Sequence, residues 1–160
     1  MMILEEEFKW LIEQTKPRSV LEIGSYSGGS LTAFADNWVE LIRAIDNGQH
    51  TEALPILQQT VKDLKELEVD IELLIADSQD ITSADWAQRW TPYDLVFIDG
   101  DHSYAGVKQD YHLYAPLGKN IAFHDINGVE PGVERFWSEI KNNTETKQIC
   151  LSQEGIGLIC

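Results

Sequence analysis

Residues 20–29 read VLEIGSYSGG, and residues 95–102 read LVFIDGDH. Each stretch begins as an apolar run typical of a buried strand and stops abruptly in a loop with glycine and polar or acidic side chains. In an open parallel sheet flanked by helices, ligands bind outside the carboxyl ends of the strands, where the strand order reverses. The two stretches therefore predict neighbouring walls of one ligand pocket.

The rest of the chain alternates apolar runs with helical patterns, which predicts an α/β, doubly wound, Rossmann-like fold. At 160 residues we expect a single domain over 1–160, with 1–18 holding a helix before the first strand. Only a short turn around residues 153–155 lies between the last two strands, so these should pair antiparallel. Strands are predicted at 19–23, 41–45, 71–76, 95–98, 121–123, 147–151 and 156–159, and helices at 3–14, 30–37, 53–67, 83–88, 104–114 and 132–141.

The composition limits the partners. A net charge of −15 argues against nucleic acid, because phosphate backbones are bound by clusters of Lys and Arg. No apolar run is long enough for a bilayer, and residues 1–9 lack the pattern of a signal peptide, so we expect a cytoplasmic protein without a membrane partner. Cys150 and Cys160 lie in apolar stretches and are expected to be buried thiols. The Glu5-Glu6-Glu7 run is expected to form a solvated helical face.

The first loop distinguishes between nucleotide ligands. A dinucleotide fingerprint GxGxxG would need glycine at position 26, where this chain has Tyr26, and the spacing is instead Glu22-x-Gly24-x-x-x-Gly28. Glycine allows close approach of the backbone to a ligand. The carboxylate at the strand end suits a cationic or amine-bearing ligand better than a pyrophosphate.

Acidic residues also end the next two predicted strands. Asp46 lies 22 residues after Gly24, where a carboxylate can hydrogen-bond ribose hydroxyls. Asp77 and Ser78 end the third strand and suit the amino group of adenine. Each acid alone is more often a cap or a solvated loop residue, but the set at three successive strand ends favours a nucleoside site.

The whole pattern resembles the class I S-adenosylmethionine-dependent methyltransferases. Within that class it is similar to the family of macrocin-type sugar O-methyltransferases and cephalosporin hydroxylase-like proteins. The resemblance is carried by VLEIG at 20–24, Asp46, FIDGDHSYAGVKQD at 97–110, PL at 116–117 and IAFHD at 121–125. It spans nearly the whole chain and implies a seven-stranded sheet of order 3-2-1-4-5-7-6 with strand 7 antiparallel.

The resemblance also implies roles for individual positions. A divalent ion would be held by Asp99, His124 and Asp125, although His124 replaces an oxygen ligand and favours a softer ion than magnesium, or no metal. His102, three residues after Asp99, would act as the general base at a catalytic site that includes Asp99. S-adenosylmethionine would be bound by Glu22, Gly24, Ser25, Tyr26, Gly28, Asp46, Asp77, Ser78 and Asp99.

Ordinary structural roles are the alternative for the two histidines. His102 precedes a predicted helix and is equally suited to a loop or capping role. His124 could pack under a strand end while Asp125 caps the following turn.

These residues together predict a methyltransferase that uses S-adenosylmethionine to methylate oxygen in a small hydroxylated acceptor such as a sugar. Such transfer is an in-line displacement, in which a bound cation lowers the pKa of the acceptor hydroxyl and an imidazole takes its proton. Two other functions are left open. One is a non-catalytic S-adenosylmethionine binder or accessory subunit, favoured by the lack of insertions that would cover an acceptor. The other is a nicotinamide-dependent oxidoreductase, against which Tyr26 argues. The sequence does not identify the acceptor. It also does not show whether the chain forms a homo-oligomer.

Overall fold

The computed structural model describes residues 2–160, with side chains from Glu5 onward. The strands are β1 (Ser19–Ile23), β2 (Leu41–Asp46), β3 (Asp70–Ile75), β4 (Tyr93–Ile98), β5 (Gly118–His124), β6 (Thr146–Ile149) and β7 (Ile156–Ile159). The helices are α1 (Met2–Thr15), α2 (Gly29–Asp36), α3 (Leu54–Glu66), α4 (Ile81–Ala87), α5 (Tyr104–Tyr114) and α6 (Pro131–Lys141). Short 3-10 turns, η1 (Gln88–Trp90) and η2 (Ala115–Leu117), follow α4 and α5.

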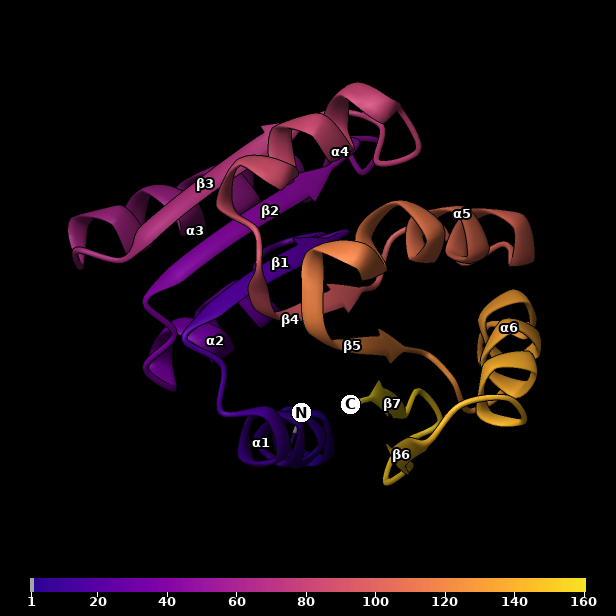
Figure 1. The fold of residues 1–160 in the computed structure, drawn as a ribbon. Coiled ribbons are helices and arrows are strands. Elements are labelled where there is room, and N and C mark those ends of the chain that lie inside the picture. The colour runs from indigo at the N-terminus through magenta and orange to yellow at the C-terminus, as the bar shows by residue number, and fades with distance from the viewer. Residues whose placement is uncertain (1) are drawn as a thin grey trace.

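The strands form one seven-stranded sheet of order β3-β2-β1-β4-β5-β7-β6 (Figure 1). The first five strands run parallel, and β7 pairs antiparallel with both β5 and β6. The predicted fold class, strand order and antiparallel last pair are therefore confirmed. The largest difference in strand bounds is at β5, which begins at Gly118 rather than at the first apolar residue, Ile121. Gly118 and Asn120 pair with Tyr93 and Leu95 of β4, and this end of β5 tolerates polar residues because it is less covered than its apolar half.

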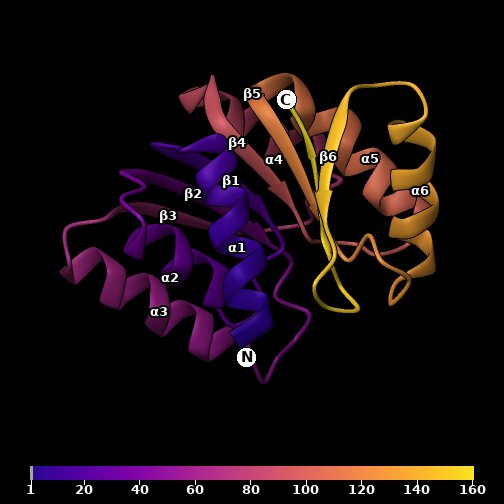
Figure 2. The same ribbon diagram turned by 90° about the horizontal axis from the view of Figure 1, so that it is seen from below.

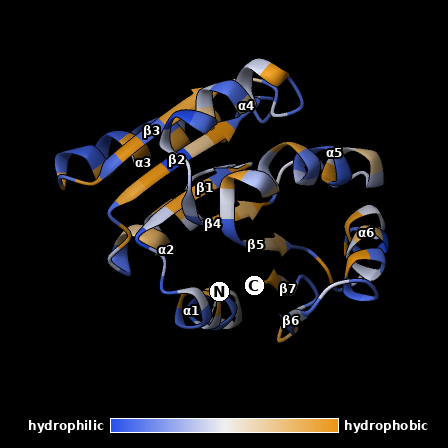
Figure 3. Ribbon diagram, in the orientation of Figure 1, coloured by the Kyte–Doolittle hydropathy of each residue, from blue (hydrophilic) through white to orange (hydrophobic). Residues whose placement is uncertain are grey.

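Helices cover both faces of the sheet, and this explains why its central strands are nearly all apolar. On one face α1, α2 and α3 pack through Phe8, Phe34 and Leu57. Figure 2 shows these three helices on the same face of the sheet. On the other face α4, α5 and α6 pack through residues that include Tyr114 and Trp137. Figure 3 shows the orange, apolar strands between helices that carry blue, polar residues. No helix in the described part of the chain is both long and apolar enough to cross a bilayer.

Two expectations about single residues were wrong. Cys150 and Cys160 are exposed, because one follows the edge strand β6 and the other follows the end of β7. Glu7 is fully buried, unlike its neighbours Glu5 and Glu6. It lies one helical turn before the buried Leu11 and therefore on the apolar side of α1.

Candidate active site

A cavity of about 1360 Å³ lies at the carboxyl ends of the parallel strands. The two stretches that decide the fold meet there, since β1 pairs with β4 and the loops after both strands line the cavity. The lining also includes residues after β2, β3 and β5, side chains of α1, and Glu154 from the turn between β6 and β7. The lining residues predicted from the sequence are Gly24, Ser25, Tyr26, Asp46, Asp77, Ser78, Asp99, His102, His124 and Asp125.

The loop after β1 is shaped by a glycine and by Asp46. Gly24 has a φ of +82°, and a Cβ at this position would lie 2.2 Å from the carbonyl oxygen of Asp99, so the two loops touch through bare backbone. Asp46 Oδ2 accepts hydrogen bonds from the N–H groups of Ser25 (2.9 Å) and Tyr26 (3.1 Å). Its Oδ1 accepts one from the N–H of Gly48 at 2.8 Å. Asp46 thus holds the first loop as well as facing the cavity.

Glu22 lies behind the cavity wall instead of in it, and Gly28 is likewise outside the lining. The Glu22 carboxyl is fully buried and accepts hydrogen bonds from Ser25 Oγ (3.0 Å) and Ser30 Oγ. Burial raises the pKa of Glu22 to about 8, so the side chain is mostly protonated at neutral pH. Its immediate role is to fix two serines that do line the cavity.

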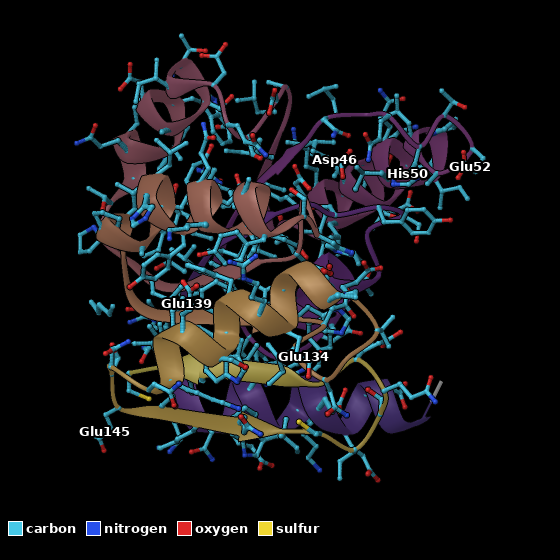
Figure 4. The ribbon with its side chains drawn as sticks, turned by 90° about the vertical axis from the view of Figure 1, so that its right-hand side faces the viewer. Asp46, His50, Glu52, Glu134, Glu139 and Glu145 are labelled. Carbon is cyan, nitrogen blue, oxygen red and sulfur yellow. The ribbon has the colours of Figure 1, made fainter. Side chains whose placement is uncertain are left out.

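The end of the cavity at the loops after β2 and β3 is lined by polar side chains and by the rings of Tyr26 and His50. Figure 4 shows Asp46 and His50 at this end of the molecule. The rings of Tyr26 and His50 meet edge to face with centroids 5.2 Å apart. Ser78 Oγ donates a hydrogen bond to Oδ1 of the buried Asp110 at 2.8 Å, which fixes the loop after β3. Asp110 is the last residue of the motif at 97–110, but the spacing of residues within that motif does not predict its contact with Ser78.

The opposite end of the cavity holds two histidines around a pair of aspartates. His102 Nε2 lies 3.3 Å from Asp99 Oδ1 and 3.5 Å from Asp125 Oδ2. His124 Nδ1 lies 3.3 Å from Asp99 Oδ2 and 3.6 Å from Asp125 Oδ1. Asp125 has a φ of +62°, a left-handed conformation that aspartate tolerates better than most residues. That backbone geometry turns its carboxylate back toward both histidines.

Two glutamates that the sequence did not indicate face the outer nitrogens of the histidines. Glu130 Oε1 lies 3.4 Å from His102 Nδ1, and Glu154 Oε2 lies 3.7 Å from His124 Nε2. The only sequence signal for Glu130 is its place before Pro131 at the start of α6, and Glu154 lies in a turn. Their approach depends on the packing of distant segments, which a local pattern does not encode.

The carboxylates make both imidazoles strongly basic. The hydrogen bond with Asp99 is the main cause that raises the pKa of His102 to about 9. Burial alone would lower the pKa of His124, but the hydrogen bond and charge of Asp99 outweigh it and raise that pKa to about 9 as well. Both rings are therefore protonated at pH 7 when only carboxylates surround them. An imidazole with its ordinary pKa of about 6.5 would instead be mostly neutral at this pH.

The cluster has the donor set and spacing of a divalent-cation site. Two ligand atoms about 2.1 Å from one cation lie about 3.0 to 3.5 Å apart at octahedral or tetrahedral angles, close to the separations seen here. The donor groups Asp99, His102 and Asp125 lie within 4.8 Å of one another, as do His124, Asp125 and Glu154. In the part of the chain that the structure describes, His124 Nε2 and Glu154 Oε2 are buried without a hydrogen-bond partner. These residues could therefore hold a divalent cation in two overlapping groups that share Asp125, and the groups differ from the predicted set by including His102 and Glu154.

Comparison with known proteins adds the family. Residues 21–126 match the family model described as "Methyltransferase domain". A Staphylococcus aureus protein provisionally assigned as a caffeoyl-CoA O-methyltransferase is similar in structure, with a TM-score of 0.77, 17% identity, and coverage of 98% of this chain and 82% of that one. The Bacillus cereus O-methyltransferase in complex with SAH has a TM-score of 0.71, 15% identity, and coverage of 98% and 80%. The O-methyltransferase TomG from Streptomyces achromogenes, involved in tomaymycin synthesis and solved with SAM, has a TM-score of 0.71, 16% identity, and coverage of 97% and 78%. No curated protein sequence matches this chain.

Proposed function

Because the chain belongs to the methyltransferase domain family, we propose that it transfers the methyl group of S-adenosylmethionine to a hydroxyl oxygen of a small molecule, such as a sugar. One observation carries the proposal. A single cavity holds a nucleoside-type loop system after β1, β2 and β3 and a cluster of acids and imidazoles after β4 and β5. A methyl donor and an acceptor can therefore bind next to each other at the carboxyl ends of the strands.

The cofactor would lie across the first three strand ends. Asp46 would hold the ribose hydroxyls, because its carboxylate lines the cavity while it orders the loop after β1. Asp77 and Ser78 would face the adenine, and the loop around Gly24 would pass under the methionine portion. Tyr26 would cover the cofactor at the mouth of the cavity.

The charge of the site bears on the acceptor. Asp99, Asp101, Asp125, Glu130 and Glu154 all line the cavity, and the chain has a net charge of −15. Such a field repels phosphorylated or otherwise anionic molecules and favours neutral or cationic ones. A neutral molecule with several hydroxyl groups is the acceptor class that these carboxylates suit best.

Proton removal is the task that we assign to His102. Asp99, His124 and Asp125 would hold a divalent cation, which when bound lowers the pKa of the acceptor hydroxyl. With part of their charge neutralised by that cation, Asp99 and Asp125 would raise the pKa of His102 less, and its Nε2 could then accept the proton of the acceptor hydroxyl. Glu130 lies beside His102 Nδ1 and keeps Nε2 directed into the cavity.

Thermal unfolding with added cofactor tests the binding half of the proposal. S-adenosylhomocysteine should raise the melting temperature, because a ligand that binds only the folded state stabilises it. Asp46→Ala should weaken that shift, whereas Glu52→Ala should not, because Glu52 is an exposed acid outside the lining. A shift with NADH and none with millimolar S-adenosylhomocysteine would refute the proposed cofactor.

Transfer of a labelled methyl group to neutral polyhydroxylated acceptors tests the chemical half. Chelator should abolish transfer, and a divalent ion should restore it. Full activity in excess chelator would remove the cation from the mechanism. Cofactor binding without transfer to any acceptor would instead favour the non-catalytic binder.

A further inference from the structure

His124 has a different partner at each ring nitrogen. Nδ1 faces the two aspartates, at 3.3 Å from Asp99 and 3.6 Å from Asp125, while Nε2 faces Glu154 Oε2 at 3.7 Å. His124 is only 9% exposed. Among the described residues, neither Nε2 nor Glu154 Oε2 has a hydrogen-bond partner. A buried donor and a buried acceptor that face each other unpaired are costly, so a direct hydrogen bond between them would stabilise this arrangement.

The main chain of Glu154 is held in place by hydrogen bonds on both sides. Its N–H donates to Ser152 Oγ at 3.0 Å, and its carbonyl oxygen accepts from the N–H of Asn127 at 2.9 Å. Ser152 Oγ in turn donates to Glu7 Oε2 at 2.9 Å. Glu7 Oε1 also accepts from the N–H groups of Leu151 (2.7 Å) and Ser152 (2.9 Å).

Glu7 therefore ties α1 to the turn of the β6–β7 hairpin. The contact joins residues 145 positions apart in the chain. Figure 2 shows that this turn and α1 lie on the same side of the molecule. A buried carboxylate that accepts three hydrogen bonds is a strong constraint, because breaking it would leave a charge without partners.

We infer that Glu154, held by Glu7 and Ser152, is a positioning residue that fixes His124 as a nitrogen ligand of the site's cation. A neutral imidazole can offer a lone pair at Nδ1 only if its proton is on Nε2, and Glu154 is placed to accept that proton in a hydrogen bond. Such carboxylate–histidine–metal arrangements orient the ring and increase its strength as a ligand. The inference rests on the cation of the proposed function but not on methyl transfer.

The inference also predicts which cation the site prefers. Mg²⁺ and Mn²⁺ favour oxygen ligands, whereas an imidazole suits later divalent ions such as Co²⁺ and Zn²⁺. Locking His124 through Glu154 should thus raise the affinity for Co²⁺ and contribute little to that for Mg²⁺.

Titration with Co²⁺ alone, without cofactor or acceptor, tests the role of Glu154. We expect Glu154→Ala to weaken Co²⁺ binding about 10- to 100-fold and Ser152→Ala to weaken it less. Glu145→Gln is the matched control, because this exposed glutamate lies beside Thr146, at the end of the hairpin away from its turn. Glu145 is labelled in Figure 4. Thermal unfolding without metal identifies any variant that fails to fold.

The outcomes separate the two proposals. If the wild-type protein binds Co²⁺ and Glu154→Ala binds it equally well, the role of Glu154 is refuted while the cation site stands. If the wild-type protein binds neither Co²⁺ nor Mn²⁺, the cation site and the role of Glu154 are both refuted. Binding of S-adenosylhomocysteine is judged separately, from the melting temperature.

Imidazole ¹⁵N spectra of the protein with Zn²⁺ give a readout that does not depend on a variant. We expect the proton of His124 on Nε2 and the metal on Nδ1. Metal on Nε2, or an unchanged His124 spectrum after Zn²⁺ is added, would overturn the inference.

Discussion

Replacing Glu22 by glutamine should stabilise the protein at neutral and mildly alkaline pH. Burial raises the pKa of Glu22 from 4.5 to about 8. An acid whose pKa is higher in the folded state contributes its full stability below the unfolded pKa, and loses it as pH rises toward the folded pKa. Glutamine has the shape of the protonated acid and no proton to lose. Its oxygen can accept from one serine, and its amide can donate to the hydroxyl oxygen of the other.

The size of the effect follows from the pKa difference. The interval from 4.5 to about 8, at about 1.4 kcal/mol per pKa unit, sets an upper limit of about 5 kcal/mol. Between pH 5 and pH 8, Glu22 should cost the wild-type protein on the order of 3 kcal/mol in free energy of unfolding. Glu22→Gln should remove this loss.

Urea unfolding of both proteins at pH 5 and pH 8, without cofactor, measures the effect. The quantity of interest is how much the difference in free energy of unfolding between wild type and Glu22→Gln changes between the two pH values. Other titrating groups cancel, because they are common to both proteins. The exposed Glu145→Gln supplies the control and should show no such pH-dependent gain. A stability difference between wild type and Glu22→Gln that is the same at both pH values would refute the reasoning, since it would mean that Glu22 is already ionised in the folded protein.

Three further substitutions probe the loops and the base. Asp46→Asn should lose part of the acceptor set for three backbone N–H groups, costing about 1 to 3 kcal/mol in urea unfolding and weakening the S-adenosylhomocysteine shift. Gly24→Ala should unfold at markedly lower temperature than Gly29→Ala, because a Cβ at Gly24 lies 2.2 Å from a carbonyl oxygen and one at Gly29 has nothing within 4 Å; equal melting points would contradict this. His102→Ala should cut turnover by about 10² to 10⁴ with cofactor affinity nearly unchanged, and near wild-type turnover would show that it is not the base.

Much of the fold could be predicted because its signals are local. Buried parallel strands such as β1 and β4 are continuous apolar runs, and a turn of a few residues allows only an antiparallel pair at the end of the chain. Strand order depends on contacts between distant segments. It is predicted only through the family resemblance, which motifs such as residues 97–110 carry. Most of the site residues predicted from the sequence line the cavity, because they lie at or just after the ends of recognisable strands.

The rest of the site depends on contacts between distant segments. Glu130 and Glu154 reach the histidines only because α6 and the β6–β7 hairpin pack beside β5. Glu7 was misjudged from its acidic neighbours, although its place one turn before Leu11 was a signal of burial. Glu22 was assigned to the ligand from its position at a strand end, whereas two serine hydroxyls meet it first.

The position of β7 between β5 and β6 has a consequence for local unfolding. In the sheet, β6 pairs with β7, and Ile156 of β7 pairs with His124 on one side and Ile149 on the other. If β7 separates from β5, then β6 and the turn that carries Glu154 must leave with it, while β1, β2 and β3 stay paired with one another. These segments should therefore exchange their amide hydrogens as one cooperative unit, distinct from β1, β2 and β3. A partly open molecule would keep Asp99, His124 and Asp125 together at the ends of β4 and β5, and it would lose only the carboxylate of Glu154 that faces His124.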